Sequence, residues 1–321
     1  MGQSGKRPLK IGVFLPLIED PTRNGVTSWA ELVAMAKAAE DVGFDSLWVP
    51  DHFIFREREP GAGTVGIWEG WSVLAALAAA TTRVELGPLV LATSFRNPAL
   101  LAKMADTVDE ISDGRLILGL GAGWHKPEYD AFGFPFDHRY SRFEEALTII
   151  HGLLRNGHID FDGTYYQARD CELRPRGPRK NGPPILLGTT GEKMLRLAAR
   201  YADQWNVSWR NDANEIPPFR ALVDAACADV GRDPATLERT AGVMVDLPGT
   251  PGRPGLNKDS PPLKGSIEEI AEGLSAYTHQ GVTHLQLLID PPTLAGIEGF
   301  APVLELLDTG HSEPAEESLS D

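Results

Sequence analysis

The feature that most constrains this chain is a regular alternation of short apolar runs with amphipathic helical segments. Eight runs have the length and apolar content of buried strands: residues 9–16, 46–52, 84–93, 115–123, 184–189, 203–209, 241–247 and 284–289. A helix between two strands returns the chain to the same end, so consecutive strands are parallel. Eight such units predict a single (β/α)8 barrel, with an open doubly wound sheet as the alternative.

Local signals mark the first residues of two helices. Ser28 with Glu31 three residues later is a capping box, and Asn97 is an N-cap directly before a proline. Gly43 ends the first of these helices. Further helices are expected near residues 71–80, 139–154, 192–201, 216–230, 267–280 and 296–307.

Two segments depart from the alternation within the one barrel domain expected over residues 1–308, and a tail follows it. Residues 157–184 are polar, aromatic and rich in Pro and Gly, which predicts a hairpin insertion before the fifth strand. Residues 248–262 follow a strand and are either a lid over the active site or a surface loop. Residues 309–321 are expected to be a disordered acidic tail.

Charge and cysteine content limit the classes of partner. The formal net charge is −15, and such an acidic surface disfavours nucleic acid and anionic membranes. Two cysteines give neither a metal-ligand spacing nor a disulfide framework. No signal peptide or membrane-spanning stretch is recognisable. These observations predict a cytoplasmic protein that acts on a small molecule without a metal.

Candidate catalytic residues follow from the barrel, because barrel active sites lie at the carboxyl ends of the strands. The second strand ends in Asp51-His52-Phe53. His52 could exchange a proton near neutral pH, and Asp51 could assist it or bind a cofactor. An Asp-His pair at a strand end often has only a structural role, so it indicates an active site only together with the residues around it.

Two further strand ends favour a cofactor. Gly121-Ala122-Gly123 ends the fourth strand, where missing side chains would let a flat ring approach, or where the strand simply turns tightly. Gly188-Thr189-Thr190-Gly191 ends the fifth strand and opens a helix, which is either an anion site or an ordinary helix start. Arg139 and Tyr140 could approach a cofactor phosphate bound at this anion site.

The segments 43–53, 95–136 and 185–207 resemble the signature stretches of the bacterial luciferase-like superfamily. The resemblance extends in order to about residue 308 and is strongest to the branch of F420-dependent, deazaflavin-using oxidoreductases. It implies a (β/α)8 barrel that binds F420 or FMN, with the phosphate at residues 188–191. It also implies a non-prolyl cis peptide at Leu89-Val90, behind the ring, and a catalytic role for His52.

One position departs from the sugar-phosphate dehydrogenase branch of this superfamily. That branch has a glutamate directly after the fourth-strand glycines, whereas this chain has Trp124, and its nearest acid is Glu128. The sugar-phosphate reaction is therefore disfavoured. Phe53, Trp124 and Glu128 are expected to line a more apolar substrate pocket.

Three functions follow from the resemblance. The leading one is hydride transfer between F420 and an organic substrate. The alternatives are a two-component monooxygenase that uses reduced FMN and oxygen, and a barrel that binds a flavin without turnover. The resemblance further implies a homodimer and a separate reductase that supplies reduced cofactor.

Overall fold

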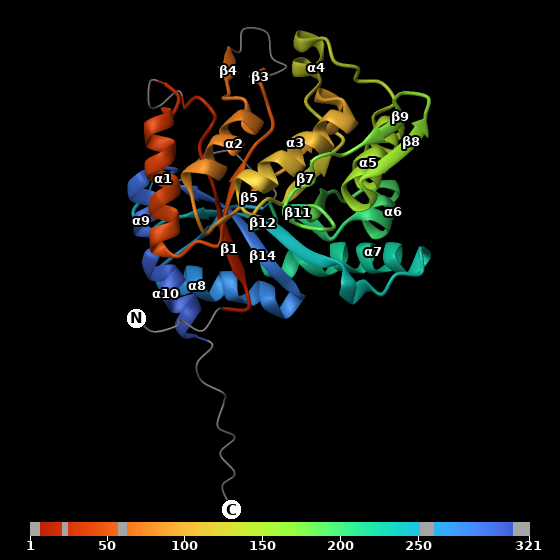
Figure 1. Cartoon of the computed structure of the whole chain (residues 1–321). Helices are drawn as coiled ribbons and strands as arrows, with labels where there is room; N and C mark the ends of the chain where they lie inside the picture. The colour runs from red at the N-terminus through yellow and green to blue at the C-terminus, as the bar shows by residue number, and fades with distance from the viewer. Residues whose placement is uncertain (1–6, 21–24, 57–62, 251–259, 311–321) are drawn as a thin grey trace, which may run out of the picture.

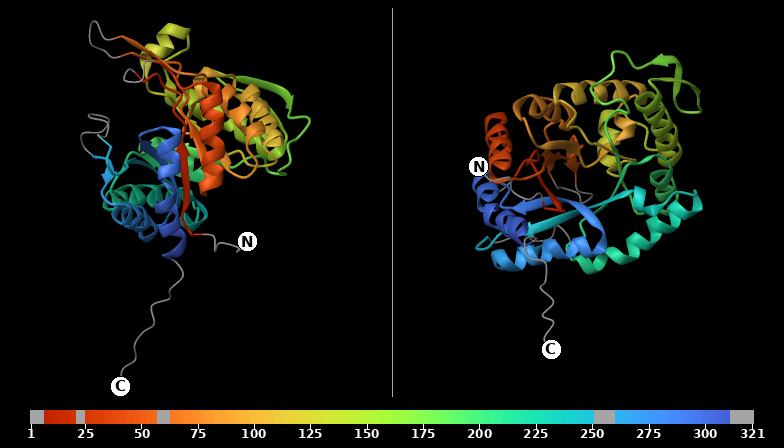
Figure 2. Two further views of the ribbon diagram at one scale, coloured as in Figure 1. Left: turned by 90° about the vertical axis from the view of Figure 1, so that its left-hand side faces the viewer. Right: turned by 60° about the horizontal axis from the view of Figure 1, so that its bottom comes forward.

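The chain forms a barrel of parallel strands surrounded by helices. The structure is a computed structural model that describes residues 7–20, 25–56, 63–250 and 260–310. The sheet follows the order β5-β2-β1-β14-β12-β11-β10-β7-β6. β5 and β6 are two parts of one interrupted strand, and they pair with β2 and β7 respectively, so the sheet closes on itself. Figures 1 and 2 show the helices outside this ring, and the predicted (β/α)8 fold is confirmed.

Every predicted strand overlaps an observed one. Most of these residues are fully buried, because the helices cover the outer face and side chains fill the barrel. The barrel strands are β1 (Lys10–Phe14), β2 (Ser46–Val49), β5 (Glu85–Pro88) with β6 (Leu91–Ala92), β7 (Leu118–Gly121), β10 (Ile185–Gly188), β11 (Gln204–Ser208), β12 (Glu238–Asp246) and β14 (Val282–Asp290).

The helices begin where their capping signals predict. Ser28 and Glu31 form the expected capping box, and the Asn97 side chain accepts hydrogen bonds from Ala99 and Leu100. The outer helices are α1 (Trp29–Val42), α2 (Gly70–Ala80), α3 (Pro98–Ile111), α5 (Arg139–Asn156), α6 (Glu192–Tyr201), α7 (Ile216–Asp229), α8 (Ile267–Ser275), α9 (Leu294–Gly299) and α10 (Ala301–Thr309). The helix expected near 267–280 continues beyond α8 as a 3₁₀ turn.

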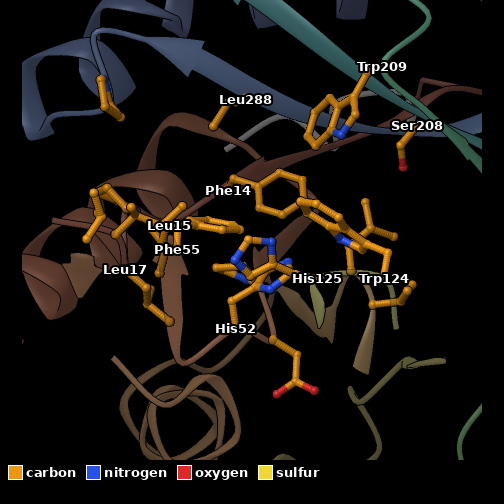
Figure 3. A pocket seen from close by; sticks show the side chains of 18 of the residues that line it. Phe14, Leu15, Leu17, His52, Phe55, Trp124, His125, Ser208, Trp209 and Leu288 are labelled. Atoms are coloured by element: carbon orange, nitrogen blue, oxygen red, sulfur yellow. The ribbon is translucent and has the colours of Figure 1, made fainter. Parts of the chain in front are cut away.

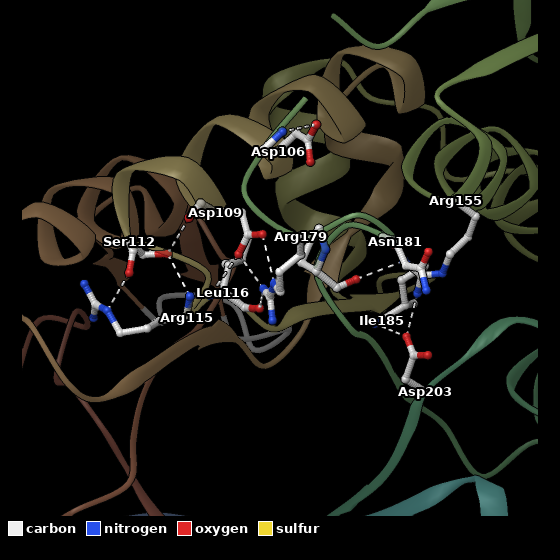
Figure 4. Close-up of polar contacts among 12 residues, drawn as sticks. Asp106, Asp109, Ser112, Arg115, Leu116, Arg155, Arg179, Asn181, Ile185 and Asp203 are labelled. Carbon is white, nitrogen blue, oxygen red and sulfur yellow. Dashed lines mark hydrogen bonds and ion pairs between the residues drawn. The ribbon is translucent and has the colours of Figure 1, made fainter. Parts of the chain in front are cut away.

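The predicted insertion contains an antiparallel hairpin of β8 (His158–Asp162) and β9 (Gln167–Glu172). Ion pairs fix the segment that returns from it to the barrel (Figure 4). Arg179 Nε lies 2.9 Å from Asp109 on α3. Asp203 accepts hydrogen bonds from Arg155 at 2.6 Å and from the Ile185 amide at 2.7 Å. These contacts set where β10 begins.

Elements that the alternation did not predict gather at the carboxyl ends of the strands, at the top of Figure 1. They are the short hairpin of β3 (Ile54–Arg56) and β4 (Thr64–Gly66), and the seven-residue helix α4 (Lys126–Phe132). The two-residue strand β13 (Leu263–Lys264) pairs with β12. Of these, α4 proves important because it carries Glu128.

Two expected segments lie largely outside the described residues. These are most of the possible lid at 248–262, of which 251–259 are not described, and nearly all of the tail at 309–321, from residue 311 on. Among the residues that are described, no helix combines the length and the hydropathy needed to span a membrane.

The barrel interior contains a buried polar group that the apolar pattern did not reveal. Nε2 of His284 lies 2.7 Å from the Ser46 hydroxyl oxygen, and the indole of Trp48 donates to the same oxygen at 2.7 Å. All three residues have no exposed surface. Burial, with a smaller contribution from Lys10, lowers the pKa of His284 to about 3. His284 is therefore neutral in the folded protein.

Candidate active site

A cavity of about 2380 Å³ opens at the carboxyl ends of the barrel strands. Its wall takes side chains from the ends of β1, β2, β7, β10, β11, β12 and β14. Figure 3 shows His52 within it, between Phe55 and Trp124, with Phe14 and Trp209 above in that view. The cavity is much larger than the roughly 300–1000 Å³ typical of a single small-ligand site.

His52 is held by a carboxylate from a distant part of the chain. Nδ1 of His52 lies 2.7 Å from Oε1 of Glu128. The other carboxylate oxygen accepts the Phe53 backbone amide at 2.9 Å. Glu128 is 1% exposed. A carboxylate only accepts hydrogen bonds, so Nδ1 donates, and Nε2 is the nitrogen left for a ligand.

The local sequence explains how Glu128 reaches His52. Gly123 adopts φ +72°, and a Cβ there would lie 1.8 Å from the Tyr129 hydroxyl. This glycine therefore lets the chain turn sharply from β7 into α4, with Pro127 in the first turn of the helix. The turn places the first residues of α4 beside the end of β2, where Glu128 contacts His52 and lines the cavity.

Asp51 makes a different set of contacts from those of His52. Both oxygens of its fully buried carboxylate accept from Arg96 at 2.9 Å, and one accepts from the Ala92 amide at 2.9 Å. Arg96 also donates to Glu69 at 2.6 Å. Burial raises the pKa of Asp51, and Arg96 opposes that shift. These contacts anchor the end of β6, so Asp51 positions the cavity wall, and its direct contact with a cofactor stays a prediction.

The expected cis peptide at Leu89-Val90 is confirmed. It separates β5 from β6, and the Val90 side chain projects toward β7 and β10. A Cβ added to Gly121 would lie 2.7 Å from Val90, and one added to Gly188 would lie 3.1 Å from it. The glycines of β7 and β10 thus make room for Val90. Val90 fills the space beside these glycines and lines the cavity together with them, and the approach of a flat ring to Gly121-Ala122-Gly123 stays a prediction.

The loop between β10 and α6 leads from the cavity wall directly into a helix. Gly188, Thr189 and Thr190 line the cavity. Thr189 is fixed through its backbone, since its carbonyl accepts the Trp205 indole at 2.7 Å and its amide donates to Asn206. The N-cap of α6 is Gly191, and a Cβ on it would meet no atom within 4 Å. A side chain at this position would therefore meet no obstacle, and α6 begins beside the cavity wall.

Four of the predicted site residues lie outside the cavity wall that the described residues define: Phe53, Arg139, Tyr140 and Gly191. Phe53 packs in an aromatic cluster with Phe95, 4.7 Å between ring centroids. Arg139 donates to the Gly123 carbonyl at 2.7 Å, and Tyr140 lies 3.5 Å from Glu144. Phe53 thus lies with the residues supporting the site, and phosphate binding by Arg139 and Tyr140 stays a prediction.

Sequence reasoning missed the part of the wall that comes from β1 and the last strands of the barrel. Phe14, Trp209 and Leu288 line the cavity, and the rings of Phe14 and Trp209 lie 5.6 Å apart. Trp209 adopts φ +61°, which is rare for a bulky residue. Trp209 directly follows β11, so its position at a strand end was the available signal. Leu288 and Phe14 look like ordinary core residues in the sequence.

Comparisons with known proteins agree with this geometry. The family model of the luciferase-like monooxygenases matches residues 9–247. The 5,10-methylenetetrahydromethanopterin reductase of Archaeoglobus fulgidus is 31% identical over 211 residues, 66% of this chain and 58% of that protein. The F420-dependent glucose-6-phosphate dehydrogenase of Amycolatopsis mediterranei is 35% identical over 179 residues, 54% and 51% of the two chains. The pyrimidine monooxygenase RutA of Methylobacterium radiotolerans is 35% identical over 242 residues, 70% and 61%.

The matched region therefore spans about half to three fifths of the length of these relatives. Solved structures extend the likeness of fold over nearly the whole chain. An F420-dependent secondary alcohol dehydrogenase in complex with an F420-acetone adduct has a TM-score of 0.76 at 19% identity, covering 93% of this chain and 99% of that one. The monooxygenase RslO1 from Streptomyces bottropensis has a TM-score of 0.72 at 19% identity, covering 94% and 98%. With its family model matched from the first barrel strand to the end of the seventh, the chain belongs to the luciferase-like monooxygenase family.

Proposed function

We propose that this protein is an F420-dependent oxidoreductase that transfers a hydride between the deazaflavin and a small organic substrate. The observation that carries the proposal is the pair of His52 and Glu128 at the edge of a large cavity. The relatives that depend on F420 support the choice of cofactor. The cofactor supplies the hydride, and the protein supplies binding, orientation and a proton.

The residues present suit such a cofactor. Val90 and the adjoining backbone of Gly121 and Ala122 would lie against the ring system. Thr189 and Thr190, with the first amides of α6, would hold a phosphate, because free amides and the helix dipole favour an anion. Asp51 would act through Arg96 and the Ala92 amide, which fix the chain beside Val90.

The chemistry assigned to the protein itself is proton transfer. Nε2 of His52 would donate a proton to the substrate, or accept one in the reverse direction. Glu128 would accept from Nδ1 and orient the ring so that Nε2 faces the substrate. His52 is the proposed catalytic residue and Glu128 its positioning residue.

A second candidate is a two-component monooxygenase that uses reduced FMN and oxygen. The matches to RutA pyrimidine monooxygenases favour it, since one is 35% identical over 242 residues. His52 would then lie beside the site of oxygen chemistry, and the phosphate would occupy the same loop.

Fluorescence titration separates the two candidates. The purified protein is titrated with F420 and, in parallel, with FMN, following the fluorescence of each cofactor. We expect F420 to bind more tightly than FMN. Binding of FMN with no binding of F420 would overturn the first candidate in favour of the second. Thr189→Val and Thr190→Val should weaken whichever cofactor binds, if its phosphate lies at this loop.

Assembly and supply of cofactor belong to the same proposal. We expect a homodimer in the cytoplasm, with a separate reductase providing the reduced cofactor. Sedimentation of the purified protein with and without cofactor measures the first of these, and a sedimentation coefficient of a monomer in both conditions would contradict it.

A further inference from the structure

A group of aromatic side chains surrounds the proposed proton donor. We define the aromatic wall as Phe55, Trp124 and His125. Their ring centroids lie 4.5, 5.5 and 6.3 Å from that of His52. The three rings also contact one another, with Trp124 and His125 5.0 Å apart and Phe55 and His125 5.3 Å apart. The group lines the cavity and comes from β3 and the loop before α4.

Trp124 is the unusual member of this wall. Its side chain is 62% exposed, although it lies in a cavity beside two other rings. Its contacts with His52 and His125 are edge-on, and so much of the indole is exposed that it offers an apolar surface for a further ring, which aromatic groups favour in offset or edge-to-face contact. Figure 3 shows Trp124 and Phe55 on opposite sides of His52.

The charges around the cavity restrict what can lie against this surface. The described residues of the lining include six carboxylic acids, and as bases three permanently charged side chains and two histidines: Glu19, Asp20, Glu31, Asp51, Glu128 and Asp290 against Arg56, Lys126, Arg210, His52 and His125. Both oxygens of Asp130 lie 2.6 Å from Lys126. Arg96 offsets Asp51 from outside the lining. The described lining thus carries more acidic than basic side chains, which disfavours an anionic group on the substrate.

The size of the cavity allows a second ligand beside the cofactor. About 2380 Å³ is more than twice the volume of a usual single-ligand site, roughly 300–1000 Å³. A cofactor placed against Val90, Thr189 and Thr190 would leave the side near His52 for the substrate. The aromatic wall belongs to that side.

We infer that the aromatic wall binds an uncharged aromatic carbonyl compound, an aryl ketone or aldehyde, or the corresponding alcohol in the reverse direction. The inference rests on the proposed function. In the reductive direction, the carbonyl carbon gains the hydride from reduced F420 and the oxygen gains the proton from Nε2 of His52. The carbonyl becomes an alcohol and F420 becomes oxidised. His52 recovers its proton from solvent.

The test uses protein saturated with oxidised F420, so that the cofactor site is filled before a probe is added. Binding of three probes is measured by isothermal titration calorimetry. Acetophenone carries the aromatic ring, cyclohexyl methyl ketone has nearly the same shape without it, and 4-acetylbenzoate adds a negative charge. We expect acetophenone to bind roughly three- to tenfold more tightly than the cyclohexyl ketone. We expect 4-acetylbenzoate to bind more weakly than acetophenone.

Variants of Trp124 test whether this side chain causes the preference for acetophenone over cyclohexyl methyl ketone. Trp124→Ala should remove most of it, and Trp124→Phe should keep most of it, while the affinity for F420 stays unchanged in both. Leu222→Ala is the matched control, because Leu222 is 51% exposed on α7 and outside the described lining of the cavity. It should bind all three probes as the wild type does.

The outcomes separate this inference from the proposed function. Saturation with F420 followed by equal affinity for the two neutral ketones would overturn the inference and leave the proposed function standing. An unchanged preference for acetophenone in Trp124→Ala would do the same, as would tighter binding of 4-acetylbenzoate. Failure to load F420 would overturn the proposed function, and this inference with it.

Discussion

The barrel contains two histidines with opposite surroundings. His52, at the carboxyl end of β2, has a buried carboxylate on Nδ1 and a cavity on its other side. His284, in the middle of β14, has the Ser46 hydroxyl on Nε2 and no hydrogen-bond partner on Nδ1 among the described residues. Lys10 adds a positive charge to the surroundings of His284.

The chemical role of a histidine in this barrel therefore depends on its hydrogen-bond partner and its access to solvent, and not on the residue type alone. A carboxylate stabilises the charged form of an imidazole, whereas burial beside a hydroxyl and a lysine excludes it. His52 is thus suited to exchange protons, and His284 to remain neutral as part of the core. Three substitutions test the different roles of these two histidines.

The largest effect is expected for His52→Ala. Loss of a positioned proton donor or acceptor should lower kcat by about 10²–10⁴-fold with reduced F420 and an active substrate. F420 affinity, followed by fluorescence, should change little. His151→Ala is the control, since His151 is on α5 outside the described cavity lining. An unchanged kcat in His52→Ala would show that the proposed proton transfer does not occur there.

The next effect concerns His284→Gln and acid stability. The pKa of His284 is about 3 in the folded protein and near 6.5 when unfolded. The unfolded chain therefore binds a proton that the folded barrel excludes. The stability linked to this group is fully present above pH 6.5 and declines as the pH falls toward 3.

Urea unfolding at pH 7 and pH 4 measures this effect. Between these values the wild type should lose about 3 kcal/mol more free energy of unfolding than His284→Gln, which cannot titrate. Parallel loss of stability in both proteins would show that His284 is accessible to protons in the folded state.

The smallest effect is expected for Glu128→Gln. The amide oxygen of the new glutamine can still accept from the Phe53 amide, but the negative charge of Glu128 beside Nδ1 of His52 is removed. We expect kcat to fall about 10–10²-fold, less than in His52→Ala, with KM little changed. Asp130→Asn on the same helix is the control, because its carboxylate is exposed and contacts Lys126. A loss shared by both variants would point to damage to α4 instead.

The barrel itself was predictable because its signals are local. Strands buried on both faces read as apolar runs, and the caps at Ser28 and Asn97 mark helix starts within a few residues. The cis peptide at Leu89-Val90 was predicted only through the family resemblance. No local pattern in residues 84–93 indicates where that strand is interrupted.

The partners of the candidate site were less predictable. Asp51 and His52 are neighbours in sequence, yet their side chains have different partners. Asp51 contacts Arg96, which is 45 positions away in the sequence, and His52 contacts Glu128, which is 76 positions away. The sequence offered the nearest acid, Asp51, as the partner of His52. In the structure the partner of His52 is Glu128, because the Asp51 carboxylate forms an ion pair with Arg96 instead.

The sequence by itself determined the eight strands, the helices that enclose them and the strand end on which His52 lies, since periodicity and capping act over short distances. Three properties became visible only in the folded chain: Glu128 is the carboxylate that holds His52, Val90 fills the space beside the glycines, and burial keeps His284 neutral. Those properties depend on side chains far apart in the sequence that meet only when the barrel closes.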